Sequence, residues 1–359
     1  MSIFLGFLAF RLLIAFLNYL FRARLPRVKD NASLPTLSVL IPARNEASNI
    51  GLILHDLIRI EGEEIREIIV YDDASDDATP DIVSEYMLQD ERIRLLRSQG
   101  LPDGWLGKNN ACHRLAQEAR GDYFLFLDAD VRVAPDFINR LLAYAVGKKV
   151  SLLSIFPCQT MYSWAEKITV PNMHVILLSL LLLPMVRRVG FSSVAAANGQ
   201  CMLFESRVYR ALLPHLRFRA SRAEDIEIAR YLKKQKEKVA CLTGVATIRC
   251  RMYDSLDSAI EGFSKNVTFF FGNSYVGAIF YWLLTTLGWV FVGISSFELL
   301  LLYLSMGLLM RLFISLTALQ NVFNNIILAI PQQLMLGAFI VKSLKNKHRG
   351  YFSWKGRKL

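Results

Sequence analysis

Two aspartates one residue apart, Asp128 and Asp130, directly follow the apolar run 123–127. That run predicts a strand buried on both faces, which would hold both carboxylates on a rigid support within reach of one divalent cation. Hard oxygen ligands of this kind suit Mg²⁺ or Mn²⁺, and such an ion would neutralise a diphosphate leaving group. Because this spacing is common by chance, a solvated turn after the strand is the competing interpretation.

A second acidic cluster, residues 72–77, follows the strand predicted over residues 67–71. A carboxylate there could accept hydrogen bonds from a ribose or a base edge. The same residues also fit a helix N-cap before Thr79 and Pro80, because Asp and Ser both serve that role. The cluster further matches the DDxxD signature of prenyl-diphosphate enzymes, but those carboxylates belong on a helix and these follow a strand.

The segment Gly104-Trp105-Leu106-Gly107-Lys108 resembles a phosphate loop only superficially, because Asn109 stands where a P-loop requires Ser or Thr. Lys108 would nevertheless open a helix predicted over residues 109–120. There it could contact a phosphate through its own charge and the helix dipole together. An exposed lysine without function is the alternative.

The acids Glu224 and Asp225 precede a helical pattern over residues 226–234. A carboxylate in this place could be the general base that removes a proton from an acceptor hydroxyl. The alternative is again an acid that caps a helix.

Further along, Arg249, Arg251, Tyr253 and Lys265 lie just before an apolar segment. They are interpreted either as snorkelling interfacial residues or as a lid over phosphates at a membrane surface.

These candidate residues share a position relative to the predicted elements. Between residues 36 and 265, short β-branched runs alternate with amphipathic helical patterns, which predicts an α/β fold with βαβ units. The predicted strands are residues 37–41, 67–71 and 123–127. The two acidic clusters therefore follow the carboxyl ends of strands, where open α/β sheets bind ligands.

Apolar segments at both ends predict a membrane protein. Residues 3–21 are apolar except for Arg11 and Asn18, and the basic charge follows this run, which favours an N-terminal anchor over residues 1–22 rather than a signal peptide. Residues 266–341 carry only two charges, and we expect two crossings plus one segment partly in the interface. An apolar interfacial or re-entrant helix is expected near residues 174–186.

Charge and cysteine usage set the orientation. The net charge of +11 is concentrated in residues 22–30 and in the basic tail 342–359. This distribution favours segments that flank a membrane, with anionic inner-leaflet lipids as partners, and argues against nucleic acid. Five cysteines without CxxC spacing indicate a reduced compartment. We therefore expect a multi-pass protein of the cell membrane with its α/β domain on the cytosolic side.

The order of the motifs resembles the family 2 glycosyltransferases over residues 36–265. In chain order they are PARNE, DDASDD, GWLGK, DAD, Gly199 and AED. The resemblance implies a GT-A, Rossmann-like nucleotide-sugar-binding domain and an inverting, metal-dependent transfer of a hexose from a nucleotide sugar such as a UDP-sugar. By position it assigns Pro42, Glu46 and Asp73 to the nucleoside, Lys108 to the diphosphate, Asp128 and Asp130 to the metal and nucleotide, and Asp225 to the catalytic base.

The chain layout and the GWxGK signature look most like the membrane glycosyltransferases associated with carotenoid and hopanoid biosynthesis. This implies a membrane lipid acceptor such as a carotenoid, a hopanoid or another isoprenoid or glycolipid, with Gly199, Glu224 and Arg251 as acceptor or lid candidates. Where that group has a GGH- or GGF-like element, this chain has residues 213–215, Leu-Pro-His. It also lacks the QxxRW of processive polysaccharide synthases, which favours a single transfer. A non-catalytic membrane scaffold is a further alternative, which would leave both carboxylate sets idle.

Overall fold

The computed structural model describes residues 1–28, 33–348, 353–354 and 357–358. The chain divides into two compact units, which we call the sheet unit and the helical unit. The sheet unit comprises Ala23–Cys158 and Met185–Cys250, and the helical unit comprises Met1–Arg22, Gln159–Pro184 and Arg251–Leu359. The predicted segment 36–265 thus contributes residues to both units.

The sheet unit is built on a mixed eight-stranded sheet, which confirms the predicted α/β fold class. Its strand order is β3-β2-β1-β4-β7-β6-β8-β5. The strands are β1 (Leu37–Ala43), β2 (Ile65–Asp72), β3 (Ile93–Arg97), β4 (Tyr123–Leu127), β5 (Val131–Val133), β6 (Leu152–Gln159), β7 (Cys201–Glu205) and β8 (Val239–Cys250). Strands β1 to β4 run parallel, and β7 pairs antiparallel to β4.

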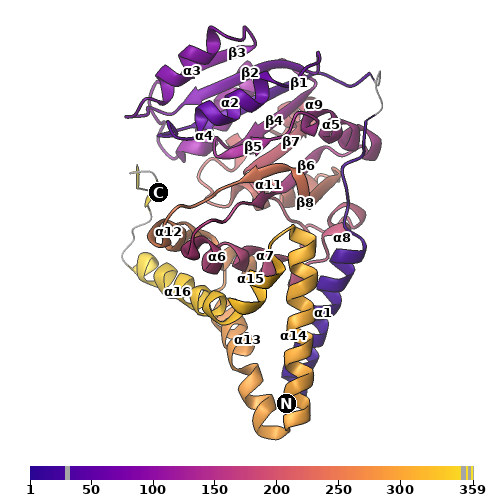
Figure 1. Ribbon diagram of the computed structural model, residues 1–359. Helices are drawn as coiled ribbons and strands as arrows, with labels where there is room; N and C mark the ends of the chain where they lie inside the picture. Colours follow the sequence, from indigo (N-terminus) through magenta and orange to yellow (C-terminus); the bar gives the residue numbers. More distant parts are fainter. Residues whose placement is uncertain (29–32, 349–352, 355–356, 359) are drawn as a thin grey trace. The chain divides into compact units, whose positions relative to one another are not determined.

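Helices α2, α3 and α4 pack against this sheet (Figure 1). The helices of the unit are α2 (Ile50–Ile58), α3 (Thr79–Met87), α4 (Gly107–Glu118), α5 (Phe137–Lys148), α9 (Ser206–Leu212), α10 (Pro214–Arg217) and α11 (Glu224–Lys234). Short α8 (Leu183–Arg188) spans the boundary between the units. The predicted helix over residues 109–120 begins two residues earlier than expected, so Lys108 lies in its first turn.

A buried polar cluster joins β1, β2 and the turn before β4. The Ser38 hydroxyl is fully buried, donates to Glu67 Oε1 over 2.7 Å and accepts from the Gly121 N–H over 2.8 Å. A β-carbon on Gly121 would lie only 2.5 Å from the Ser38 backbone nitrogen. A glycine is therefore needed here because the two backbones approach too closely for any side chain.

We expect Gly121→Ala to lower the free energy of unfolding by about 1–3 kcal/mol, the usual cost of overpacking a dense core. Gly147→Ala is the matched control, because Gly147 lies near the end of α5 with no atom within 4 Å of the added β-carbon. That control should be neutral or slightly stabilising. Thermal unfolding midpoints of the two purified full-length variants test this, and equal midpoints would contradict it.

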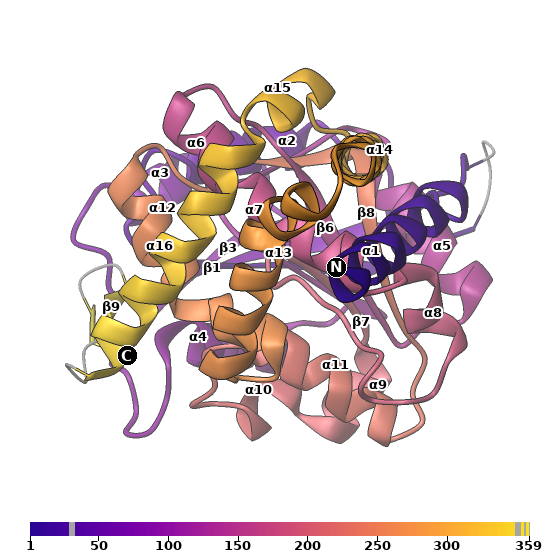
Figure 2. The same cartoon turned by 90° about the horizontal axis from the view of Figure 1, so that it is seen from below.

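The helical unit contains three helices that are long and apolar enough to cross a membrane, judged by length and composition over the described residues. They are α1 (Ser2–Leu20), α13 (Tyr275–Ser295) and α14 (Phe297–Ala318). Around them lie α6 (Trp164–Thr169), α7 (Pro171–Leu180), α12 (Leu256–Asn266), the 3₁₀ segment Val267–Phe271, α15 (Val322–Ile327) and α16 (Ala329–His348) (Figure 2). Residues 342–348 of the predicted basic tail continue α16. Most of the remaining tail lies outside the described residues.

The two polar residues inside the first apolar helix make specific contacts. Arg11 Nη2 donates to the Tyr281 hydroxyl over 2.8 Å, and Arg11 Nε donates to Ser179 Oγ over 3.1 Å. Asn18 Nδ2 donates to the Leu178 and Leu181 carbonyls. Both residues are buried, so they tie α1 to α7 and α13. The number of membrane crossings and the placement of the segment 174–186 remain predictions.

Candidate active site

The loops after β1 and β2 interlock through side chains that the sequence analysis did not single out. Arg44 Nη1 donates to the Asp73 carbonyl over 2.6 Å and to the Ala74 carbonyl over 2.9 Å. Asn45 Oδ1 accepts from the Asp76 N–H over 2.9 Å. Asn45 and Ala74 both have positive φ values, 50° and 54°. The PARNE loop and the DDASDD loop therefore form one hydrogen-bonded rim.

Three predicted donor-binding residues belong to this rim or to the strand beneath it. Pro42 lies on β1 opposite Tyr71 of β2. Asp73 is 2% exposed, and its N–H donates to the Ala43 carbonyl at the end of β1. The Glu46 N–H donates to Thr79 Oγ1, while Glu46 Oε2 accepts from Asn49. These contacts place all three residues at or beside the carboxyl ends of adjacent parallel strands.

Lys108 is the centre of a second group of contacts. Its ammonium lies 2.6 Å from Asp128 Oδ1 and 2.8 Å from Asp128 Oδ2, and it donates to the Gly199 carbonyl over 3.2 Å. Burial works against a charge here, but the nearby Asp128 and Glu224 carboxylates raise the pKa of Lys108 above its ordinary value. The ammonium therefore keeps its charge and joins the end of β4 to the segment before β7.

The AED segment reaches the same place through Gly199. The Gly199 N–H donates to Asp225 Oδ2 over 3.1 Å, and the Ile226 N–H donates to Asp225 Oδ1 over 2.7 Å. A β-carbon on Gly199 would lie 3.3 Å from Lys108 Nζ and 3.4 Å from Glu224 Oε1. Gly199 thus lets an ammonium and two carboxylates approach one another closely, and a larger residue there would force them apart.

Burial dominates the protonation of this acidic pair. It raises the pKa of Glu224 to about 7, with Lys108 opposing and the Asp225 charge reinforcing the shift. It raises the pKa of Asp225 as well, against the N–H donors of Ile226 and Gly199 and the charge of Lys108. A carboxylate with a raised pKa accepts a proton more readily near neutral pH, which is what a general base requires.

Asn109 connects the start of α4 to the segment that leads into this pair, and no motif had indicated it. Its Nδ2 donates to the carbonyls of Phe218, Arg219 and Ser221 over 2.9, 3.2 and 2.9 Å. The Leu106 N–H also donates to the Arg219 carbonyl. Asn109 is 1% exposed, so its side-chain amide is buried against these carbonyls. The sequence holds no local signal for these contacts, because their partners lie 109 to 112 residues away.

Asp130 behaves as a carboxylate that is suited to a cation. Burial, reinforced by Asp128 and Glu46, raises its pKa to about 7. Among the described residues its Oδ1 atom is buried and accepts no hydrogen bond. No group of three or more His, Cys, Asp or Glu in the described part of the chain could hold a metal alone. Asp128 and Asp130 therefore fit an Mg²⁺-type site only in the form where substrate phosphates complete the coordination.

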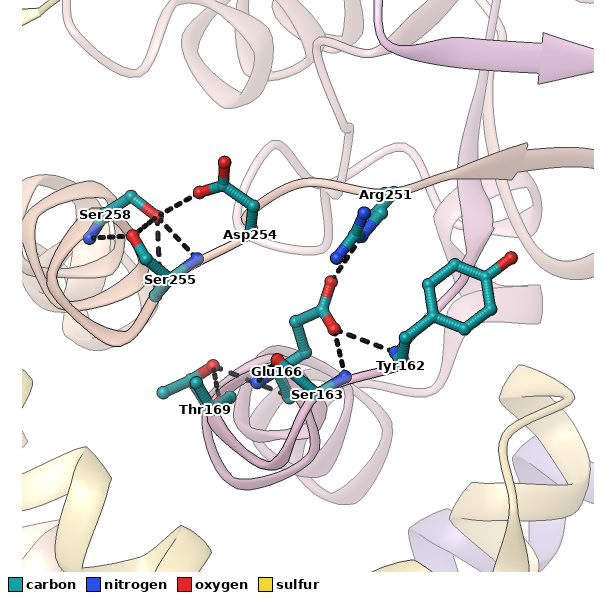
Figure 3. A network of polar contacts seen from close by, with 9 residues as sticks. Tyr162, Ser163, Glu166, Thr169, Arg251, Asp254, Ser255 and Ser258 are labelled. Atoms are coloured by element: carbon teal, nitrogen blue, oxygen red, sulfur yellow. Dashed lines mark hydrogen bonds and ion pairs between the residues drawn. The ribbon is translucent and has the colours of Figure 1, made fainter.

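Two residues that the resemblance had drawn attention to have structural partners instead. Arg251 belongs to the helical unit, where its Nε lies 2.7 Å from Oε1 of the buried Glu166 and its guanidinium covers the Tyr162 ring (Figure 3). The contacts of Lys108 with Asp128 and Gly199 are therefore made without Arg251.

His215 is buried against Tyr209, whose hydroxyl lies 2.7 Å from His215 Nδ1. Burial lowers the pKa of His215 to about 3.

Comparison with known proteins bears on this site. Residues 38–213 match the model of glycosyl transferase family 2. A 4,4'-diaponeurosporenoate glycosyltransferase of Staphylococcus haemolyticus is 25% identical over 67% of this chain and 63% of its own length. The corresponding enzyme of Staphylococcus aureus is 26% identical over 89% of this chain and 87% of its own length. A β-monoglucosyldiacylglycerol synthase of Trichormus variabilis is 29% identical over 34% of this chain, and the match spans 26% of that protein.

Among solved structures, a mannosyltransferase from Pyrobaculum calidifontis, determined with GDP-Man and Mn²⁺, has a TM-score of 0.58. It is 15% identical and the match covers 96% of this chain and 97% of that one. At this identity the likeness shows the fold alone. The segment that matches the family 2 model, residues 38–213, contains the hydrogen-bonded loops after β1 and β2, Lys108, the Asp128–Asp130 pair and Gly199. Residues 38–213 therefore form a glycosyl transferase family 2 domain with a GT-A-like fold.

Proposed function

We propose that this protein transfers one sugar, with inversion, from a nucleotide sugar such as a UDP-sugar to a membrane lipid. The observation that carries the proposal is the cluster in which Asp225, Gly199 and Lys108 are linked by hydrogen bonds to Asp128 at the end of β4. This cluster supports the proposal because Asp225, the proposed base, and Lys108, the proposed phosphate-binding cation, both bind Gly199. The names of the Staphylococcus and Trichormus relatives point to carotenoid and glycerolipid acceptors.

In the proposed step, an acceptor hydroxyl oxygen attacks C1 of the donor sugar. The new C–O bond forms as the bond from C1 to the diphosphate oxygen breaks, and the electron pair leaves with the nucleoside diphosphate. The hydroxyl proton passes to the Asp225 carboxylate, whose pKa burial has raised. A carboxylate acceptor would already be ionised and would need less from Asp225.

In this proposal two groups of residues bind the donor, one at its nucleoside and one at its diphosphate. Pro42, Glu46 and Asp73 line the nucleoside side, and Lys108 balances the charge of the diphosphate. A divalent ion, Mg²⁺ or Mn²⁺, held by Asp128 and Asp130 would supply further charge neutralisation of the leaving group when bound. The unpartnered Asp130 Oδ1 atom supports this assignment.

The setting is a membrane surface. The three candidate spans support a multi-pass cell-membrane protein, and the basic residues after α1 and in α16 support a cytosolic catalytic domain next to anionic lipids of the inner leaflet. Glu224 lies next to the base and serves as an acceptor-side residue. Arg251 remains a lid candidate because 46% of its side chain is exposed despite its pairing with Glu166.

Replacing Asp225 by Asn should lower turnover by about 10²–10⁴-fold, the usual contribution of a general base, because the amide cannot take the acceptor proton. Binding of the nucleotide sugar should persist. The assay incubates the purified chain, Mn²⁺ and a panel of nucleotide sugars with a membrane lipid extract, and mass spectrometry identifies the lipid whose mass rises.

Glu227→Gln is the matched control for that variant, since it removes one carboxylate from the same first turn of α11 without touching the cluster. Its rate should be close to that of the unmodified protein. Equal rates for the Asp225 variant and the unmodified protein would exclude Asp225 as the base.

Lys108→Gln should move the acidic limb of the pH–rate profile to higher pH. The ammonium lowers the pKa values of Asp225 and Glu224, so its loss raises both, and the base is then ionised only at higher pH. The measurement is kcat against pH between about 5 and 9, the range over which such bell-shaped profiles are read. A lower rate with an unmoved limb would show that Lys108 does not act on the base.

Asn109→Ala should reduce kcat by about tenfold, because a 1 Å displacement of the acid-bearing segment can cost up to about 100-fold in rate. Asn109 is a positioning residue here, so the KM for the nucleotide sugar should change less than kcat. Gln117→Ala, on the exposed side of the same helix, is the control. A change in KM alone would contradict the positioning role.

A further inference from the structure

The helical unit contains a small polar pocket that the glycosyl-transfer proposal does not use. Its volume is about 120 Å³. The lining residues are Gln159, Met161, Lys167, Leu319, Gln320, Asn321, Asn324 and Asn325. Pockets for drug-sized ligands are about 300–1,000 Å³, so this one is too small for a nucleotide sugar. It suits a group of the size of a lipid headgroup fragment.

The lining chemistry selects an anion. Five of the eight lining residues carry amide side chains, one is a lysine and none is acidic. In the described residues no carboxylate lies within ion-pair distance of Lys167, although its neighbour Glu166 pairs with Arg251. Asn321 uses its Oδ1 atom to cap α15, which leaves its NH₂ group available as a donor. Asn325 Nδ2 already donates to Ser315 and Gln320, and Gln320 Nε2 contacts His174, so the pocket combines the Lys167 ammonium with the amide N–H groups of Asn321 and Asn324.

A second cation, Arg311, is hydrogen-bonded to Asn325, one of the residues that line the pocket. Arg311 Nη1 donates to the Asn325 carbonyl over 2.9 Å and to Gln332 Oε1 over 2.6 Å. Gln332 Nε2 in turn donates to the Lys167 carbonyl. Arg311 has no carboxylate partner among the described residues, so its charge is balanced only by carbonyl dipoles. Both positive charges favour a negative ligand over a neutral one.

The pocket lies where two candidate spans end. Helix α14 ends at Ala318, and the next three residues line the pocket. Arg22, two residues beyond the end of α1, donates from Nη1 to the Leu316 and Thr317 carbonyls in the last turn of α14. The ends of α1 and α14 therefore lie together. If these helices cross the bilayer, the pocket lies at headgroup depth.

An apolar surface continues from the pocket along α14. Leu316 and Leu319 are 36% and 45% exposed, and further along the helix Leu309, Leu308 and Leu304 are also exposed. An acyl chain could lie on these side chains while its phosphate remains in the pocket. Cationic pockets beside membrane helices are a known means of lipid headgroup recognition.

We propose that this pocket binds the phosphate of an anionic phospholipid, with Lys167 and the Asn321 and Asn324 amides as its direct contacts. The bound lipid then joins the end of α14, the start of α15 and helix α6. This site does not depend on the proposed transfer reaction, since its ligand is retained rather than consumed.

The test counts lipids retained by the full-length protein in detergent by native mass spectrometry. The probes are phosphatidylglycerol, zwitterionic phosphatidylcholine of the same acyl chains, and inorganic phosphate. We expect one tightly held phosphatidylglycerol per chain and no comparable phosphatidylcholine. Lys167→Gln should weaken retention about tenfold, the order expected for one charge-assisted hydrogen bond. Lys167→Arg should retain the lipid.

Lys345→Gln is the matched control, because it removes the same charge from an exposed position of α16 in the same unit. It should retain phosphatidylglycerol like the unmodified chain. Asn324→Leu provides an independent variant, since it replaces an amide donor by apolar atoms inside the pocket and should also release the lipid.

Equal phosphatidylglycerol retention by Lys167→Gln, Asn324→Leu and the unmodified chain would overturn the proposal. Equal retention of the two lipids would also overturn it, because both carry a phosphate and the net negative charge of phosphatidylglycerol would then contribute nothing to binding. A thermal shift with inorganic phosphate and none with phosphatidylglycerol would assign the pocket to a free anion and reject the lipid. None of these readouts measures sugar transfer, so a failed transferase assay leaves this test unaffected.

Discussion

The ion pair between Lys108 and Asp128 is the interaction on which the arrangement of the site depends. Asp128, Glu224 and Asp225 approach one another in a partly buried region, where like charges repel more strongly than in bulk water because the effective dielectric constant is lower. The ammonium lies between them and offsets that repulsion. Without it, the carboxylates would either take up protons or move apart. The proposed base and the Asp128–Asp130 pair can share one small space because one cation offsets the negative charge of both.

The beginning of α4 brings this cation to its place and also holds the acidic segment. Lys108 points to the end of β4, while its neighbour Asn109 binds three carbonyls of the chain that leads into Asp225. Two adjacent residues thus connect the end of β4 with the segment that leads into α11. The position of the proposed base, Asp225, therefore depends on where the start of α4 lies.

The helical unit follows a different rule for its charged groups. Arg11 and Arg311 lie in apolar helices and have hydroxyl, amide and carbonyl partners rather than carboxylates. Dipolar partners satisfy the hydrogen-bond donors of a guanidinium but leave its charge unbalanced. That residual charge joins the helices through directional contacts and, near Arg311, gives the adjacent pocket its preference for an anion.

The sequence by itself determined the elements and their order. The runs 37–41, 67–71 and 123–127 are mostly apolar and rich in β-branched or aromatic residues, which predicts buried strands, and each proved to lie within a strand of the sheet. Motif order also indicated the family. Only the tertiary structure decided which side chains meet. Asn109 contacts residues 109 to 112 positions away, and Gly199 contacts residues 91 and 26 positions away. No local pattern encodes such contacts. For the same reason the partner of Arg251 could not be predicted, because Glu166 lies 85 residues away and the pairing depends on how the chain folds back.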